Sequence, residues 1–284
     1  MRRIALMLTT LAALALTACN NGASSGSTAT QASVPHSVSG TVSLMTPRVL
    51  SPKASMTISL VDASAEQSQP LVSKTISPVQ MPAKFTLDFD SAKINPADIY
   101  LVKVDLTDGQ RTFSMPVQAP VITRSAPTTH VEIRLLANKT PSEMLEDQYT
   151  KLMKNLGAYK ISNGRQLEKD KSRGWQTFQS NDNGQIVFVR ENVDHAKKGF
   201  SSLEFAYRDG KPWFIVSRQM ASQNARPNEE MRAGWDADGK LVVNEDTANG
   251  KTGPLSDAQL THLKDQAAAM LKLAKSRAPR HHKH

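Results

Sequence analysis

The sequence predicts a mainly β protein, with an N-terminal antiparallel β-sandwich of about seven strands and a C-terminal α+β domain. Between residues 37 and 137, short segments of alternating apolar and polar residues are separated by turn residues, which is typical of a sandwich. After residue 138 the chain contains all three tryptophans and two stretches with apolar residues at helical spacing. This change in composition predicts two separate cores.

Residues 1–18 form an export signal that does not belong to the fold. Two arginines follow Met1, and the apolar run from Ile4 to Leu16 is too short to span a bilayer. The run ends in Leu16-Thr17-Ala18-Cys19, which resembles the lipobox of bacterial lipoproteins. In that family the cysteine carries diacylglycerol on sulfur, the chain is cut before it, and a further acyl chain such as palmitate is added to the new amine. The resemblance implies lipid attachment at Cys19; the alternative is a plain signal peptide with an incidental cysteine.

Cys19 is the only cysteine of the chain, which excludes an intramolecular disulfide and any cysteine-rich metal site. Lipid attachment would turn the Cys19 sulfur into a thioether, which suits an oxidising compartment better than a free thiol does. Residue 20 is Asn. The sorting rule of enteric lipoproteins keeps those with Asp at this place in the inner membrane, so the resemblance implies the outer membrane, facing the periplasm. Residues 19–36 begin at the cysteine that we expect to be lipidated and contain no large apolar residue before Val34. This composition predicts a flexible tether.

Seven strands are predicted between residues 37 and 137, with no helix. Alternation of apolar and polar residues marks Val38–Leu44, Met56–Leu60, Leu71–Ile76, Phe85–Phe89, Tyr100–Leu106, Arg111–Met115 and Val131–Leu135. Asp108-Gly109 favours a tight hairpin, because glycine adopts the positive φ angle that such turns need. Most prolines fall between the strands, where a missing backbone donor does no harm.

Several motifs in this region resemble the YbaY/YscW-type envelope lipoproteins. They are Val38-Ser-Gly40-Thr-Val42, Leu50-Ser-Pro52-Lys-Ala54, Leu60-Val61-Asp62-Ala63-Ser64, Pro82-Ala-Lys-Phe85-Thr-Leu-Asp-Phe89-Asp90, Ile94-Asn-Pro96 with Tyr100, Asp108-Gly109 and Pro120-Val121-Ile122-Thr123. The resemblance covers about residues 37–137 and implies a small periplasmic β-sandwich on a lipid anchor. Some relatives are pilotins, which bind a secretin subunit and help it reach the outer membrane. The family implies no catalytic residue and no cofactor. Pilotins of this type can carry a disulfide, which a chain with one cysteine cannot form.

Residues 138–276 predict two helices around an antiparallel meander. Thr140-Pro141-Ser142-Glu143 is a capping box with proline at the first helical position, and apolar residues then recur at helical spacing up to Leu156, before Gly157. We expect this stripe to pack on a core, the alternative being a helix that docks into a partner's groove. Ser256-Asp-Ala-Gln259 is a second capping box, which predicts a helix over 256–276 on the same face of the sheet.

The meander follows from a weak repeat of strand, Asn/Asp-Gly turn and strand. Its turns are Asn183-Gly184, Asp209-Gly210 and Asp238-Gly239, which predicts about six strands. An aromatic-rich sheet of this kind can bind a glycan or a peptide through Trp175, Trp213 or Trp235. The alternative, that these tryptophans pack against the helices, is favoured because large aromatic residues are mostly buried.

The sequence contains no signature of catalysis or of metal binding. There is no nucleophile-elbow, zinc-protease, EF-hand or phosphate-loop motif. The adjacent acids Glu229-Glu230 and Glu245-Asp246 are typical of a solvated surface, although acids distant in sequence can meet in a fold. His281, His282 and His284 form a terminal cluster, for which we expect a mobile tail and no ordered metal site.

The formal net charge of +9 is concentrated near the C-terminus. Residues 266–284 carry five basic residues and no acidic one, and the basic, His-rich tail is 277–284. This charge favours contact with a phosphate-rich membrane surface or another anionic polymer. Nucleic-acid binding is not expected, because neither a reading module nor the compartment favours it.

These observations predict a non-catalytic, lipid-anchored outer-membrane protein that acts as a binding or chaperone module for an envelope protein, such as a secretin or an assembly factor. The rival hypothesis is a lipoprotein that binds cell-envelope glycan or lipopolysaccharide through the C-terminal aromatic residues and the tail. An unrecognised hydrolase is the third, because acid–base sites assemble from residues far apart in sequence.

Overall fold

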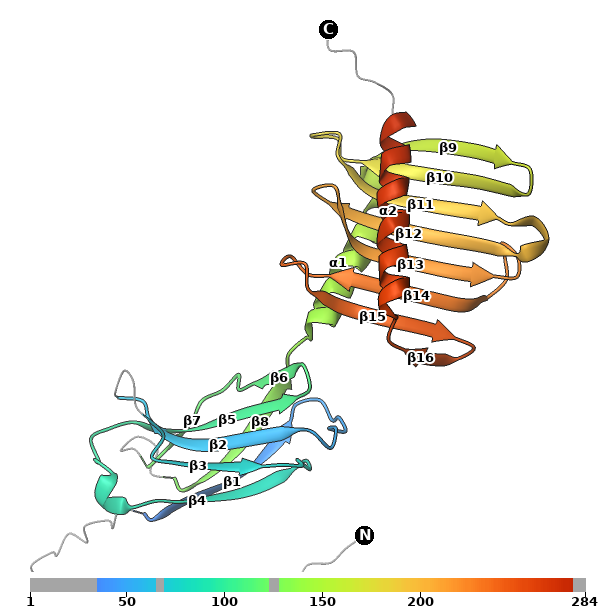
Figure 1. The fold of residues 1–284 in the computed structure, drawn as a ribbon. Coiled ribbons are helices and arrows are strands. Elements are labelled where there is room, and N and C mark those ends of the chain that lie inside the picture. The colour runs from blue at the N-terminus through green and yellow to red at the C-terminus, as the bar shows by residue number, and fades with distance from the viewer. Residues whose placement is uncertain (1–34, 65–68, 123–127, 278–284) are drawn as a thin grey trace, which may run out of the picture.

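The computed structural model describes residues 35–64, 69–122 and 128–277, and it contains two eight-stranded sheets (Figure 1). Residues 37–137 build the first sheet and are called the N-terminal module; residues 138–276, the C-terminal module, build the second sheet and two helices. The predicted signal peptide, Cys19, most of the tether and residues 278–284 lie outside the described residues. We propose that the two modules are separate domains joined at residues 138–140.

The N-terminal module contains all seven predicted strands and one more. The strands are β1 Ser37–Leu44, β2 Ser55–Asp62, β3 Val72–Ile76, β4 Ala83–Asp88, β5 Tyr100–Asp108, β6 Arg111–Ser114, β7 Ala119–Val121 and β8 His130–Ala137, with a 3-10 turn, η1, at Ser91–Lys93. Their order is β3-β2-β5-β6-β8-β1-β4, and β7 pairs with β5. The prediction missed β7, which has three residues and contains Pro120, a residue that cannot donate to a ladder.

The layers β3-β2-β5 and β8-β1-β4 enclose one apolar core, which includes the fully buried Val38, Met56 and Leu135. The pair β1–β8 runs parallel, in contrast to the antiparallel arrangement that the sequence predicts. This pair is also close, because a Cβ atom at Gly40 would lie 2.2 Å from the carbonyl oxygen of Val131. Residue 40 must therefore be glycine for β1 and β8 to pair as they do.

The C-terminal module is a meander in which every strand pairs with its neighbour in sequence. Its elements are α1 Pro141–Lys154, η2 Leu156–Ala158, β9 Lys160–Glu168, β10 Lys171–Gln179, β11 Ile186–Asp194, η3 Ala196–Lys198, β12 Phe200–Arg208, β13 Lys211–Met220, β14 Pro227–Trp235, β15 Leu241–Ala248, β16 Lys251–Gly253 and α2 Asp257–Arg277. The three predicted turns join β10 to β11, β12 to β13 and β14 to β15, and their glycines have positive φ. The prediction of six strands missed β9, which is mostly polar, and β16, which has three residues.

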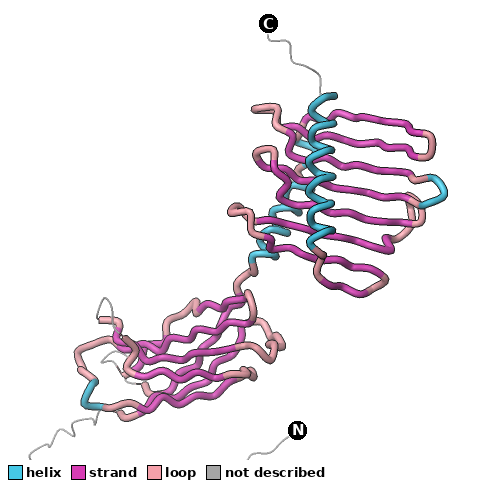
Figure 2. Tube along the Cα trace, in the orientation of Figure 1, coloured by secondary structure: helices cyan, strands magenta, loops and turns pink. Residues whose placement is uncertain are grey.

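The helices lie on opposite faces of this sheet, which corrects the prediction that both cover one face (Figure 2). From α2, Leu263 and Ala267 join the cluster that contains Phe205. From α1, Leu145 and Tyr149 join the cluster that contains the neighbouring side chains of the same strands, such as Ala206 and Phe214. Because both faces are covered, β12 and β13 are buried over five consecutive residues each.

Both predicted capping boxes are present. The Thr140 hydroxyl accepts from the Glu143 N–H, and Glu143 Oε2 accepts from the Thr140 N–H at 2.9 Å. At α2, Ser256 Oγ accepts from the Gln259 N–H, and Gln259 Oε1 accepts from the Ser256 N–H. Helix α1 ends at Lys154, one turn before the predicted stop at Gly157, which instead lies in η2.

Candidate functional site

The structure divides the candidate residues of the sequence into two groups. Cys19, the predicted lipid-attachment site, and the histidines 281, 282 and 284 lie outside the described residues. Trp175, Trp213 and Trp235 are all described and are all buried. Trp213 and Trp235 line one pocket together, and Trp175 is not part of its lining.

One opening lies in the N-terminal module, between β8 and the segment that connects β6 to β7. On this side β8 pairs with β6 only through Leu136 and Ala137. Strand β5 likewise pairs with β6 at one end and with β7 at the other, leaving its middle without a ladder partner on that side within the described residues. Between them the N–H of Val104 donates instead to Met115 Sδ, at 3.2 Å. The segment 115–118 therefore takes part in no strand pairing and leaves a gap in the sheet between β5 and β8.

This opening is a groove of about 550 Å³, which we call the β8 groove; it is lined by Met45, residues 116–120 and residues 130–134. Val131 and Ile133 of its lining are buried, whereas Val117 is 75% exposed. Pro116 and Pro120 have no N–H to leave unpaired. The groove is therefore apolar within, and His130, Glu132 and Arg134 place ionisable side chains along its edge. An apolar centre with a polar rim is the anatomy of a protein-binding surface.

The backbone of β8 is also available to a partner in this groove. The carbonyls of Thr129 and Leu135 accept from the N–H groups of Ser39 and Met45, both at 2.8 Å, so these carbonyls point to the β1 side. Backbone groups alternate in direction along a strand. The N–H and C=O groups of Glu132 and Arg134 therefore point into the groove, where the described residues give them no ladder partner. An extended peptide can pair with them by strand addition.

The tryptophans of the C-terminal module pack in its core. Trp175 lies across β9, where a Cβ atom at Gly164 would come within 2.1 Å of its ring. Trp213 and Trp235 line a second pocket, of about 620 Å³, beside α2. Arg208 lies over the ring of Trp213 at 5.1 Å and Lys264 over that of Trp235 at 4.7 Å. Because cations already occupy these ring faces, little aromatic surface remains on which a sugar can stack.

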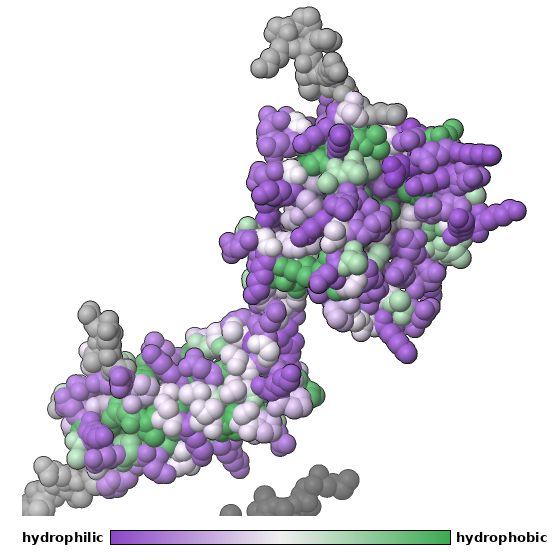
Figure 3. Space-filling view, in the orientation of Figure 1, coloured by the Kyte–Doolittle hydropathy of each residue, from purple (hydrophilic) through white to green (hydrophobic). Residues whose placement is uncertain are grey.

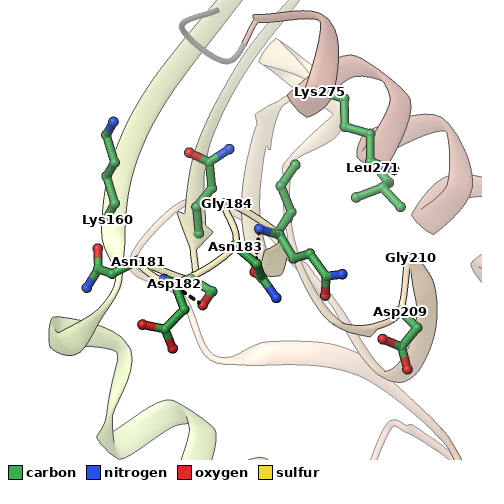
Figure 4. Close-up of a pocket in the computed structure, with 13 residues that line it drawn as sticks. Lys160, Asn181, Asp182, Asn183, Gly184, Asp209, Gly210, Leu271 and Lys275 are labelled. Carbon is green, nitrogen blue, oxygen red and sulfur yellow. Dashed lines mark hydrogen bonds between the residues drawn. The ribbon is translucent and has the colours of Figure 1, made fainter. Parts of the chain in front are cut away.

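A polar pocket of about 890 Å³ lies where the β10–β11 loop meets α2 (Figure 4). Two of its asparagine side chains are held by hydrogen bonds with backbone groups. Asn183 Oδ1 accepts from the Gln185 N–H, and Asn181 Nδ2 donates to the carbonyl of Ala158. Lys160 and Lys275 add positive charge at its edges, as Figure 4 shows. We interpret these polar groups as supports of the turn.

A charged cluster under α1 is the main feature that the sequence analysis missed. Glu204 of β12 accepts from the hydroxyl of Tyr149 at 2.8 Å, from Arg190 Nε at 3.1 Å and from Arg218 Nη1 at 3.0 Å. Burial alone would raise the pKa of Glu204, but the Tyr149 hydrogen bond and the two arginines outweigh it and lower that pKa. Burial and the adjacent Glu204 charge raise the pKa of Tyr149. The cluster thus fixes α1 on the sheet.

Glu191 and Glu204 are the buried carboxylates of the described residues, and they cannot act as a pair. Glu191 of β11 lies opposite Leu203, on the α2 face, and forms an ion pair with Arg173 at 2.5 Å. Glu204 lies on the α1 face, opposite Arg190. Burial raises the pKa of Glu191. Since the sheet separates these two carboxyl groups, they do not form the acid–base dyad of a hydrolase.

Arg111 connects the two modules. Its Nη1 atom donates to the carbonyl of Asn138 at 2.6 Å, and its Nη2 atom donates to Glu143 Oε1 at 2.5 Å. The other oxygen of Glu143 completes the capping box of α1. The Arg111 hydrogen bond, assisted by that of the Thr140 N–H, lowers the pKa of Glu143 to about 2. One carboxylate therefore both starts α1 and joins it to β6.

Within the described residues, no three His, Cys, Asp or Glu side chains are grouped so as to hold a metal ion. No helix in the same part of the chain is long and apolar enough to cross a membrane.

Comparison with known proteins points to the N-terminal module. Residues 33–135 match the family model of the type III secretion system lipoprotein chaperone YscW. Among solved structures, an alternative pilotin from the type II secretion system of Vibrio cholerae is 25% identical; the alignment covers 36% of this chain and 96% of that chain, with a TM-score of 0.33. A search of the curated proteins found no match.

Proposed function

We propose that this chain, whose residues 33–135 match the YscW family of secretion-system lipoprotein chaperones, is a non-catalytic chaperone for an envelope protein of the secretin type. The observation that carries the proposal is the β8 groove, because it lies within the family match and combines an apolar interior with unpaired backbone groups.

The groove recognises its partner in two ways. Backbone hydrogen bonds from Glu132 and Arg134 take an extended segment of the partner as an added strand, which gives affinity with little sequence selectivity. Contacts with the exposed side chains of Met45 and Val117 select apolar side chains on that segment. Such a segment, exposed on an unassembled secretin subunit, is prone to aggregation until it is covered.

Binding of a secretin subunit to two charge variants tests this assignment. Val117→Asp places a carboxylate in the apolar groove, and we expect its affinity for the subunit to fall by about tenfold or more, since about 1.4 kcal/mol corresponds to a factor of ten. The matched control is Val49→Asp, because Val49 is 96% exposed in the same module and does not line the groove. Equal binding by the two variants would show that the partner docks elsewhere.

We further propose that Cys19 carries the lipid and that the chain faces the periplasm from the outer membrane. The support is the lipobox-like sequence before Cys19, the Asn at position 20 and the lipoprotein description of the matching family. Replacement of Cys19 by Ser is expected to move the protein from the membrane fraction to the soluble fraction. A variant that stays with the membranes would contradict lipid attachment at this residue.

A further inference from the structure

Strand β9 is an open edge of the C-terminal sheet. The sheet order ends at β9, which pairs with β10 alone, so one side of its backbone has no ladder partner within the described residues. The strand has nine residues and no proline, whereas β16 at the opposite edge has three residues. A long, regular edge without proline is a template for pairing with another strand.

The residues of β9 are complementary to themselves when the strand is reversed about Gly164. The strand runs Lys-Ile-Ser-Asn-Gly-Arg-Gln-Leu-Glu, from Lys160 to Glu168. In an antiparallel pair centred on Gly164, Lys160 of one copy lies opposite Glu168 of the other. Ile161 likewise lies opposite Leu167, Ser162 opposite Gln166 and Asn163 opposite Arg165, and the two copies of Gly164 face each other. Each favourable pair occurs twice, as two-fold symmetry requires.

The exposure of the apolar pair supports this register. Ile161 is 49% exposed and Leu167 is 67% exposed, which places both among the few large apolar side chains that the described residues leave open to solvent. Both lie on the face that α1 covers, because Ile161 is opposite Phe178, a member of the α1 cluster. Pairing in this register covers both side chains with apolar partners, at a cross-strand distance at which such pairs stabilise a sheet.

The ionic pair lies on the other face of the same edge. Lys160 and Glu168 alternate with Ile161 and Leu167 along the strand, so they point to the α2 side. A shift of the register by two residues moves both charges and both apolar side chains away from their complements. On the face shown in Figure 3, hydrophilic residues predominate over the strand ends that lie away from α2. The complementarity therefore selects one register.

We propose that β9 pairs with β9 of a second copy of this chain, in an antiparallel register centred on Gly164, and that the protein is a dimer built on this edge. The two-fold axis is perpendicular to the sheet, so the two sheets become continuous and both α2 helices lie on the same face. Each dimer then carries two N-terminal modules, which raises the effective affinity for a partner that presents repeated sites. The proposal does not depend on what the β8 groove binds.

Cysteine cross-linking in cells that express the full chain tests the register. Ile161→Cys combined with Leu167→Cys places thiols opposite each other, within the Cα separation that a disulfide spans. We expect a disulfide-linked dimer on a non-reducing gel. The control pair is Ser162→Cys with Leu167→Cys, whose side chains would point to opposite faces, together with each single variant. Failure of the first pair to cross-link, or equal cross-linking by the control pair, would overturn the proposal.

A charge exchange tests the pairing independently of disulfide geometry. In the Ile161→Cys, Leu167→Cys background, Lys160→Glu or Glu168→Lys alone is expected to slow cross-linking by about tenfold, because each dimer then contains two like-charge pairs. The double exchange recreates both ion pairs and is expected to restore the rate. Loss of rate in the double variant equal to that in the single ones would contradict the pairing of Lys160 with Glu168. All four side chains are exposed, so these changes leave the fold intact.

Discussion

Glu143 shows at the scale of one residue how the two modules are held together. One of its carboxylate oxygens accepts from the Thr140 N–H and the other accepts from Arg111. The sequence predicts the first contact, because a capping box depends on residues three apart. It does not predict the second, because Arg111 is 32 residues away and nothing local relates it to Glu143.

Replacement of Glu143 by Gln isolates the charge, since Gln also completes a capping box. The pKa of Glu143 is lowered from 4.5 to about 2 in the folded chain. A lowered folded pKa means that the carboxylate stabilises the fold above its ordinary pKa, and that this contribution is lost as the pH falls from about 4.5 through about 2. We expect the variant to be less stable at neutral pH by at most about 1 kcal/mol, because the pair is partly exposed. Thermal unfolding should show that gap closing near pH 2; a gap that stays constant would contradict the ion pair.

Glu204 is the most heavily partnered carboxylate of the C-terminal module. Replacement by Gln removes the carboxylate that pairs with Arg190 and leaves Arg218 with Glu230 alone, in a largely buried site. We expect a loss of about 3 kcal/mol in the free energy of unfolding, as is typical when one partner of a buried ionic cluster is removed. Tyr149→Phe removes one hydrogen bond and should cost about 1 kcal/mol. Denaturant unfolding measures both, and a loss for Glu204→Gln no larger than for Tyr149→Phe would contradict this ranking.

At the scale of elements, the sequence predicts best what depends on neighbouring residues. Both capping boxes and all three Asn/Asp-Gly turns of the meander are confirmed, because caps and tight turns are built from consecutive residues. The prediction that both helices cover one face was wrong. In the sequence, α1 and α2 are separated by all the strands of the sheet, so no local pattern relates the face of one helix to that of the other. A signal for two covered faces was nevertheless present, because the run Trp213-Phe214-Ile215-Val216 is apolar without alternation.

The β8 groove could not be predicted for the same reason. Its apolar lining combines Met45, Val117 and Ile133 from three separate segments, which the pairing of β8 with β1 and of β6 and β7 with their neighbours brings together. The one local signal is Pro116-Val117-Gln118-Ala119-Pro120, where two prolines interrupt a strand-like segment and predict a break in pairing.

Two glycines on neighbouring strands test how closely the edge of the sheet is packed. A Cβ atom at Gly164 would lie 2.1 Å from the Trp175 ring, whereas nothing lies within 4 Å of a Cβ atom at Gly174. We expect Gly164→Ala to destabilise the chain by about 1–3 kcal/mol through overpacking. Gly174→Ala should be neutral or slightly stabilising, since it lowers the entropy of the unfolded chain. Equal effects in denaturant unfolding would show that Trp175 is not fixed across Gly164.

At the scale of the whole molecule, the chain places two independent cores on either side of residues 138–140. The N-terminal core and the two clusters of the C-terminal module share no residue. We therefore expect residues 35–139, produced alone, to fold and to bind the same partner as the full chain. Circular dichroism and a binding assay measure this; an unfolded fragment would contradict the proposed domain boundary.

The central claim is that the β8 groove escorts a secretin-type subunit to the outer membrane, and the most direct measurement is the location of that subunit in cells. With Val117→Asp as the sole copy of the chain, we expect the subunit to be depleted from the outer-membrane fraction. The control, Val49→Asp, should leave its distribution as in the wild type, with both variants present at equal levels. Normal delivery by Val117→Asp would contradict the account.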